Sequence, residues 1–137
     1  MSLLDRLRPV ARQVLGQVPE VAAAYLYGSH AEGKAQPLSD LDLAIVLRTD
    51  DRPADPLFAE RLSARIASAL GEPIEVDAHL TQDLPLPVLG EVVTAGLLLF
   101  ERDPVRRVEF ETSTRRLYFD FLPLLERDAR EGLRARG

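Results

Sequence analysis

Two aspartates, Asp40 and Asp42, stand at the entry of an apolar run over residues 41–47 that predicts a buried strand. Residues i and i+2 of a strand lie on one face, roughly 6.7 Å apart, so we expect the two carboxylates side by side at one edge of a sheet. At that separation their charges repel by about 2–3 kcal/mol at an effective dielectric of 20, and a bound cation would offset that cost. The alternative is a solvated strand entry, for which Ser-Asp is common turn chemistry.

Gly28 and Ser29 end the preceding apolar stretch, residues 21–27, and ten residues separate them from Asp40. A Gly-Ser turn can offer backbone N–H groups and a hydroxyl to a phosphate, and glycine lets the phosphate approach closely. Mg²⁺ takes oxygen ligands, usually one or two carboxylates together with substrate phosphates. Unless the turn only ends a strand, the two features indicate metal-assisted phosphoryl or nucleotidyl transfer.

The spacing G-S-x10-D-x-D, followed by an apolar strand, resembles the signature of the DNA polymerase β nucleotidyltransferase superfamily. The longer stretch GSHAEGKAQPLSDLDLAIV is most similar to the minimal nucleotidyltransferase (MNT) antitoxins, which pair with HEPN-domain ribonuclease toxins. The resemblance implies that two Mg²⁺ ions are held at Asp40 and Asp42. It also implies that Gly28, Ser29 and Ser39 bind the phosphates of ATP.

The same resemblance implies a third carboxylate on a neighbouring strand, and Asp77 in the run VDAHL occupies that place. Asp77 would complete the metal site and help to deprotonate the attacking hydroxyl, which makes Asp40, Asp42 and Asp77 the expected catalytic set. Taken alone, Asp77 would be a half-exposed strand residue. His79 shares its face, either as a partner of Asp77 or as an ordinary strand histidine.

The segment between the two motifs departs from the related pattern. Glu32 stands where arginine is common, and His30 stands where another basic residue is frequent. An anionic Glu32 near a triphosphate is unfavourable unless its side chain faces away, and Lys34 could supply the missing charge. Otherwise His30 and Lys34 are ordinary surface residues.

Composition restricts the class of protein. The chain has 137 residues, 46% of them hydrophobic and 28% charged, which fits one soluble globular domain. A net charge of −5 argues against non-specific binding to nucleic acid, which needs a basic face. The absence of cysteine, of a leader-like segment and of a long apolar run favours a cytoplasmic protein with no membrane contact.

The predicted order of elements gives an α/β (α+β) fold, with a mixed nucleotidyltransferase-like sheet of about four strands covered by helices on one face. Residues 1–103 form the predicted core domain and residues 104–137 a C-terminal helical tail, packed on the core or on a partner. Gly28 to Gly33 should turn the chain and begin a short helix, and Pro73 should begin the third strand. The expected helices cover residues 2–16 with a kink or restart at Pro9, 58–70, 85–96 and 104–134 with a break or bend at Pro123.

The run LYFDFLPLL in the tail is too apolar to be covered by so small a core, so we expect a homo- or hetero-oligomeric interface at Tyr118, Phe119 and Phe121. The chain is too short to carry an acceptor-binding domain. The resemblance therefore implies transfer of AMP from ATP to a hydroxyl, expected to be tyrosine, of a cognate HEPN toxin. The alternatives are an antitoxin that acts by binding alone, which Glu32 favours, and a small-molecule nucleotidyltransferase.

Overall fold

The computed structural model describes residues 1–33 and 39–136, with side chains as far as residue 132. Its centre is a four-stranded sheet of β1 (Val21–Tyr27), β2 (Leu41–Leu47), β3 (Val76–Leu80) and β4 (Leu97–Glu101), in the order β3-β2-β1-β4. β1 is antiparallel to both β2 and β4, and β2 is parallel to β3. The predicted mixed α/β sheet is confirmed.

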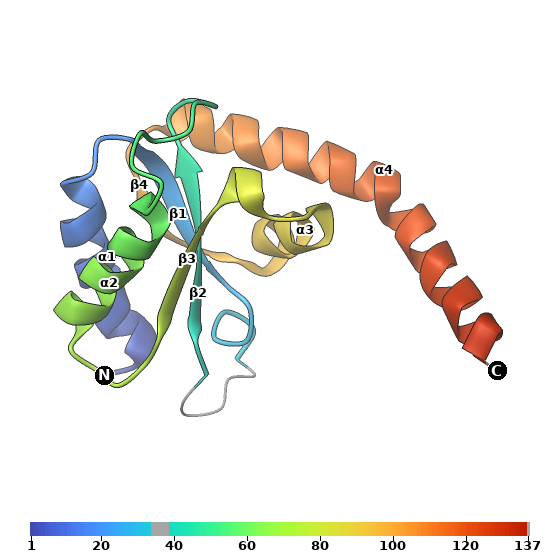
Figure 1. The fold of residues 1–137 in the computed structure, drawn as a ribbon, viewed down its shortest axis with the longest axis horizontal. Coiled ribbons are helices and arrows are strands. Elements are labelled where there is room, and N and C mark those ends of the chain that lie inside the picture. Colours follow the sequence, from blue (N-terminus) through green and yellow to red (C-terminus); the bar gives the residue numbers. More distant parts are fainter. Residues whose placement is uncertain (34–38, 137) are drawn as a thin grey trace.

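Helices α1 (Leu3–Gly16) and α2 (Phe58–Leu70) cover one face of the sheet (Figure 1). A capping box begins α1: the Ser2 hydroxyl accepts from the Asp5 backbone N–H, and the Asp5 carboxylate accepts from the Ser2 backbone N–H. Gly71 ends α2 in the left-handed conformation at φ 68°. The larger core cluster lies here and includes Leu7, Leu15, Leu41, Leu43, Ile45, Leu62 and Ile66.

The other face of the sheet is covered as well, by α3 (Leu86–Ala95) and α4 (Pro104–Arg136), so the prediction of one covered face was wrong. A second core cluster forms there from Ala22, Ala23, Tyr25, Tyr27, Ala44, Val46 and Val92. The physical reason is that β1 and β2 are apolar on both sides, which is typical of central strands with helices on each face.

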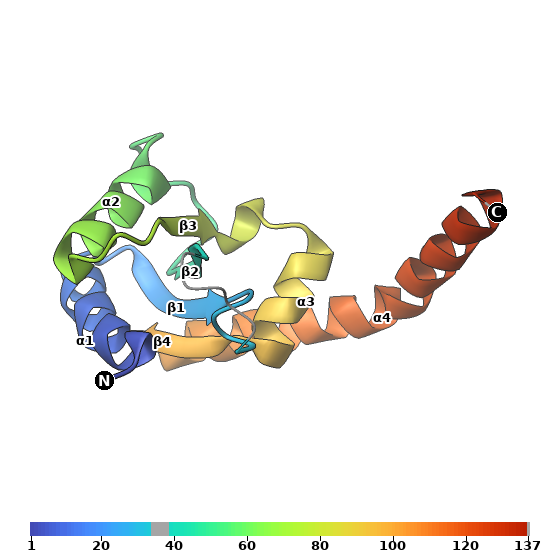
Figure 2. The same cartoon turned by 90° about the horizontal axis from the view of Figure 1, so that it is seen from below.

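The first part of α4 packs on β1 and α3, and the remainder leaves the body of the protein (Figures 1 and 2). The Tyr25 hydroxyl donates to Glu111 Oε1 over 2.5 Å, and the Tyr25 and Phe110 rings lie 5.9 Å apart. A Cβ at Gly90 would collide with the Tyr118 ring, so this tyrosine packs against α3. Of the three aromatic residues expected at an interface, Phe119 and Phe121 are the exposed ones, at 55% and 45%.

Proline and glycine positions account for the other differences from the predicted elements. β3 begins at Val76 rather than at Pro73, because the Ile74 N–H donates to the Glu72 carbonyl in a turn over 2.8 Å. Gly28 to Gly33 form a turn with no helix. α1 continues through Pro9 without a restart, and α4 continues through Pro123 but bends between its orange and red parts (Figure 1). Among the described residues, no helix is both long and apolar enough to cross a bilayer.

Candidate active site

Three strands place a row of polar side chains at one end of the sheet. Asp42 is the register partner of Tyr27 on β1 and of Asp77 on β3. Leu41 and Leu43 pack in the core under α1 and α2, so Asp42 lies on the opposite face because neighbouring strand residues alternate. The structure thus brings Asp42 and Asp77 together on adjacent strands.

Electrostatics shows that the carboxylates share one region. Burial raises the pKa of Asp42, and the negative charges of Asp77 and then Asp40 raise it further. Asp40 itself is exposed and precedes β2, whereas Asp42 is half-buried. Like charges this close disfavour one another's ionised forms, so a cation bound between them would stabilise the ionised carboxylates.

Gly28 reaches the same region from the end of β1. Its φ is 78°, and a Cβ at this position would lie 2.7 Å from Asp42 Oδ2. The residue must therefore be glycine both for the backbone conformation and for the space beside the carboxylate. Its carbonyl accepts from the N–H groups of Ala31 and Glu32 over 3.1 and 3.2 Å, which closes the turn that carries Ser29.

The two histidines of the chain both lie at this end of the sheet. His30 Nε2 donates to the Ser39 carbonyl over 2.7 Å and joins the Gly28 turn to the residue before Asp40. His79 Nε2 lies 2.9 Å from Asp77 Oδ2. The charges of His79 and His30 each act to lower the pKa of Asp42. The Glu32 side chain is exposed, and Lys34 lies outside the described residues.

Two residues near the site were not predicted from the sequence. The pKa of Tyr27 is raised to about 12, first by burial and then by the negative charges of Asp42, Asp77 and Glu91. Glu91 of α3 therefore lies near enough to this face to act on Tyr27. Tyr27 could have been suspected, because it directly precedes Gly28. Glu91 could not have been suspected. The sheet was expected to be covered by helices on one face only, and that expectation did not place α3 on the face that carries Asp42.

The carboxylate oxygens at this end of the sheet are the kind of ligand that a hard divalent cation prefers. Among the described residues, no group of three or more His, Asp or Glu side chains is close enough to hold an ion unaided. Asp42 and Asp77 nevertheless offer neighbouring hard oxygen ligands, and the raised pKa of Asp42 marks negative charge that a cation would stabilise. Mg²⁺ is commonly bound by one or two carboxylates and completed by substrate phosphates, so a complete protein cage is not required.

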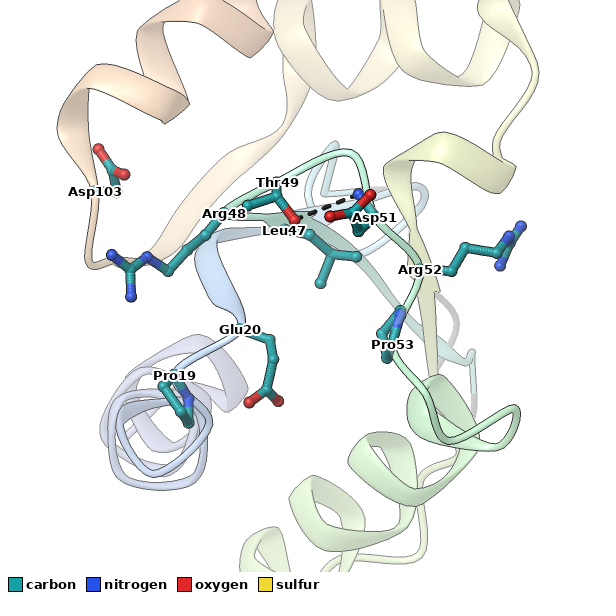
Figure 3. Close-up of a pocket in the computed structure, with 9 residues that line it drawn as sticks. All are labelled: Pro19, Glu20, Leu47, Arg48, Thr49, Asp51, Arg52, Pro53 and Asp103. Atoms are coloured by element: carbon teal, nitrogen blue, oxygen red, sulfur yellow. Dashed lines mark hydrogen bonds between the residues drawn. The ribbon is translucent and has the colours of Figure 1, made fainter.

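A cavity of about 490 Å³ lies at the other end of the same strands (Figure 3). Its lining includes Glu20 before β1, Leu47 at the end of β2, and Arg48, Thr49 and Arg52 in the segment that follows. Asp42 and Gly28 lie at the opposite strand ends. The cavity is therefore separate from the carboxylates.

Solved structures share the whole fold. A chain of a toxin-antitoxin crystal structure with AMP-PNP is 21% identical, with a TM-score of 0.69 over 95% of this chain and 98% of that chain. A chain of a mutant MntA-HpeT toxin-antitoxin complex is 19% identical, with a TM-score of 0.71 over 95% and 98%. A chain of the tri-AMPylated Shewanella oneidensis HEPN toxin in complex with MNT antitoxin is 18% identical, with a TM-score of 0.60 over 93% and 99%.

The comparison with curated proteins finds no match. The model of the family described as Polymerase beta, Nucleotidyltransferase matches residues 11–105, which is more than half of the chain and includes every predicted site residue. Its span runs from within α1 to the start of α4 and so covers the sheet that positions Gly28, Asp42 and Asp77. The superfamily predicted from the Gly-Ser and Asp-x-Asp motifs is confirmed, and the chain belongs to the polymerase beta nucleotidyltransferase family.

Proposed function

We propose that this chain is an MNT-type antitoxin that transfers AMP from ATP to a hydroxyl group of a cognate HEPN toxin in the cytoplasm. The observation that carries the proposal is the register pairing of Asp42 with Asp77 beside the close approach of Gly28. Family membership supports nucleotidyl transfer. Fold neighbours that include a complex with AMP-PNP and one with a tri-AMPylated HEPN toxin support the nucleotide and the acceptor.

In the proposed reaction, the acceptor hydroxyl oxygen bonds to the α-phosphorus of ATP and the bond to the bridging oxygen of the β-phosphate breaks. Pyrophosphate leaves, and Asp77 takes the hydroxyl proton. The turn at Gly28 and Ser29, with Ser39, binds the phosphates. Asp40, Asp42 and Asp77 would hold Mg²⁺, which when bound neutralises charge on the transferring phosphoryl group.

The toxin would meet the chain through the part of α4 that leaves the body. Phe119, Phe121 and Leu124 are exposed there, at 55%, 45% and 51%. Apolar residues gathered on a protruding helix are typical of a protein–protein contact. We propose this segment as the oligomeric interface, and α4 as a C-terminal helical tail whose first part packs on the core of residues 1–103.

The test combines the purified chain, a purified HEPN-domain toxin, MgCl₂ and ATP labelled on the α- or the γ-phosphate. We expect the toxin to become labelled with α-labelled ATP but not with γ-labelled ATP, and to lose its ribonuclease activity. Neutralisation without label would show an antitoxin that acts by binding alone, the alternative that Glu32 favours. Turnover without any partner protein would show a small-molecule nucleotidyltransferase.

A further inference from the structure

We infer that His79 is a positioning residue, which holds the Asp77 carboxylate in place for a divalent cation beside Asp42. The inference rests on the proposed function and concerns a residue outside the expected catalytic set. Its first support is the contact itself, since His79 Nε2 lies 2.9 Å from Asp77 Oδ2. The two residues stand two apart on one face of β3, so the ring lies alongside the carboxylate.

The second support is the difference between the two carboxylates that the register pairs. Asp42 lies on the central strand β2, half-buried and against Gly28, so its surroundings restrict it. Asp77 lies on β3 at the edge of the sheet, and its side chain is 55% exposed. Among the described residues, its only hydrogen-bond or ion-pair partner is His79. Removal of His79 would leave the Asp77 side chain free to change rotamer.

The third support is the place of His79 in the sheet. Its register partner on β2 is Ala44, two residues from Asp42, just as His79 is two residues from Asp77, so all four residues share one face of the two strands. Partners that orient a carboxylate ligand in this way commonly contribute 10- to 100-fold to ion affinity.

The test measures binding of Mn²⁺ by calorimetric titration of the full chain without toxin, both alone and with a non-hydrolysable ATP analogue, and the titration of the analogue by itself is subtracted. We expect His79→Leu to weaken Mn²⁺ binding by about tenfold or more, and His79→Gln, whose amide can donate to Asp77, to stay near the wild type. Gln82→Leu is the matched control for a new exposed leucine, because Gln82 is exposed on the turn after β3. It should bind Mn²⁺ as the wild type does.

An unchanged Mn²⁺ affinity in His79→Leu would overturn the inference, even if its melting temperature falls, because a purely structural histidine predicts that result. Equal losses in His79→Leu and His79→Gln would also overturn it. A wild-type chain that binds Mn²⁺ neither alone nor with the ATP analogue would overturn both this inference and the proposed metal site. If Mn²⁺ affinity falls as expected while no toxin is labelled, the positioning role stands and the proposed function fails.

Discussion

The two ends of the β1–β2 strand pair differ in how their charges are compensated. At the Arg48 end, which has the 490 Å³ cavity, Arg106 contacts Asp50 over 2.6 Å and Arg52 contacts Asp83. At the Asp42 end, Asp77 pairs with His79, and no described arginine side chain forms an ion pair with Asp40, Asp42 or Asp77. Carboxylates gathered beside a close-approaching glycine, rather than the volume of a hollow, therefore identify the candidate site.

The largest expected effect is on the reaction itself. Asp42→Asn should lower the rate of AMP transfer by about a hundredfold or more, because it removes the central charged ligand while keeping the shape of the side chain. Asp51→Asn is the matched control, since Asp51 lines the cavity at the other end of the strands. Transfer of label from ATP is the measurement. Wild-type transfer by Asp42→Asn would contradict the assignment of this end as the site.

The glycine that approaches Asp42 gives the next largest effect. Gly28→Ala and Gly71→Ala both place a side chain at positive φ, 78° and 68°, and each should lose about 1–2 kcal/mol of stability. Only a Cβ at residue 28 meets the Asp42 carboxylate, whereas nothing lies within 4 Å of one at residue 71. Transfer should therefore fall roughly tenfold to a hundredfold in Gly28→Ala alone.

Urea unfolding measures the stability of each glycine variant, and labelled ATP measures its activity. If Gly28→Ala and Gly71→Ala lose activity equally, backbone strain and not displacement of Asp42 would be the cause. If neither loses activity, the close approach of Gly28 would have no role in the reaction.

A smaller effect concerns how the free energy of unfolding depends on pH. Burial and neighbouring carboxylates raise the pKa of Asp42 in the folded protein above its ordinary value of 3.8. The folded state thus binds this proton more tightly than the unfolded chain, and the ionised carboxylate costs stability above the raised pKa. Asp42→Asn should therefore have the larger free energy of unfolding at pH 7, in the absence of divalent ions.

The difference between Asp42→Asn and the wild type should shrink as the pH falls through the raised pKa, and vanish below 3.8, where Asp42 is protonated in both states. Urea titrations of both proteins in EDTA, at a series of pH values, measure it. Added Mg²⁺ should stabilise the wild type more than the variant. A pH-independent difference would contradict an electrostatic cost at Asp42.

Local patterns in the sequence were sufficient for most elements and for the central motif. The apolar runs predicted β1 and β2, and the helices expected over residues 2–16 and 58–70 match α1 and α2 within one residue. Asp77 could be chosen from its strand and its family resemblance alone. Its pairing with Asp42 depends on a parallel register that no local pattern determines.

The sequence-based prediction failed where long-range packing decides the outcome. The prediction of a sheet covered on one face was wrong, because α4 packs across the second face, where Tyr118 fills the space beside Gly90. The position of Glu91 near Tyr27 follows from the same packing. His79 gave no decisive signal, since one histidine on a strand serves equally well as an ordinary surface residue.

The smallest expected effect comes from the end of the strands that has the large cavity. The Arg48 side chain is exposed and forms no ion pair or hydrogen bond with the described residues, although its backbone N–H donates to Glu20 over 2.9 Å. Arg48→Ala should therefore change stability by no more than about 0.5 kcal/mol, as surface substitutions usually do. It should also leave AMP transfer unchanged, as measured with labelled ATP. Loss of transfer in this variant would place a nucleotide or toxin contact in the cavity, and the functional contrast between the two ends would no longer hold.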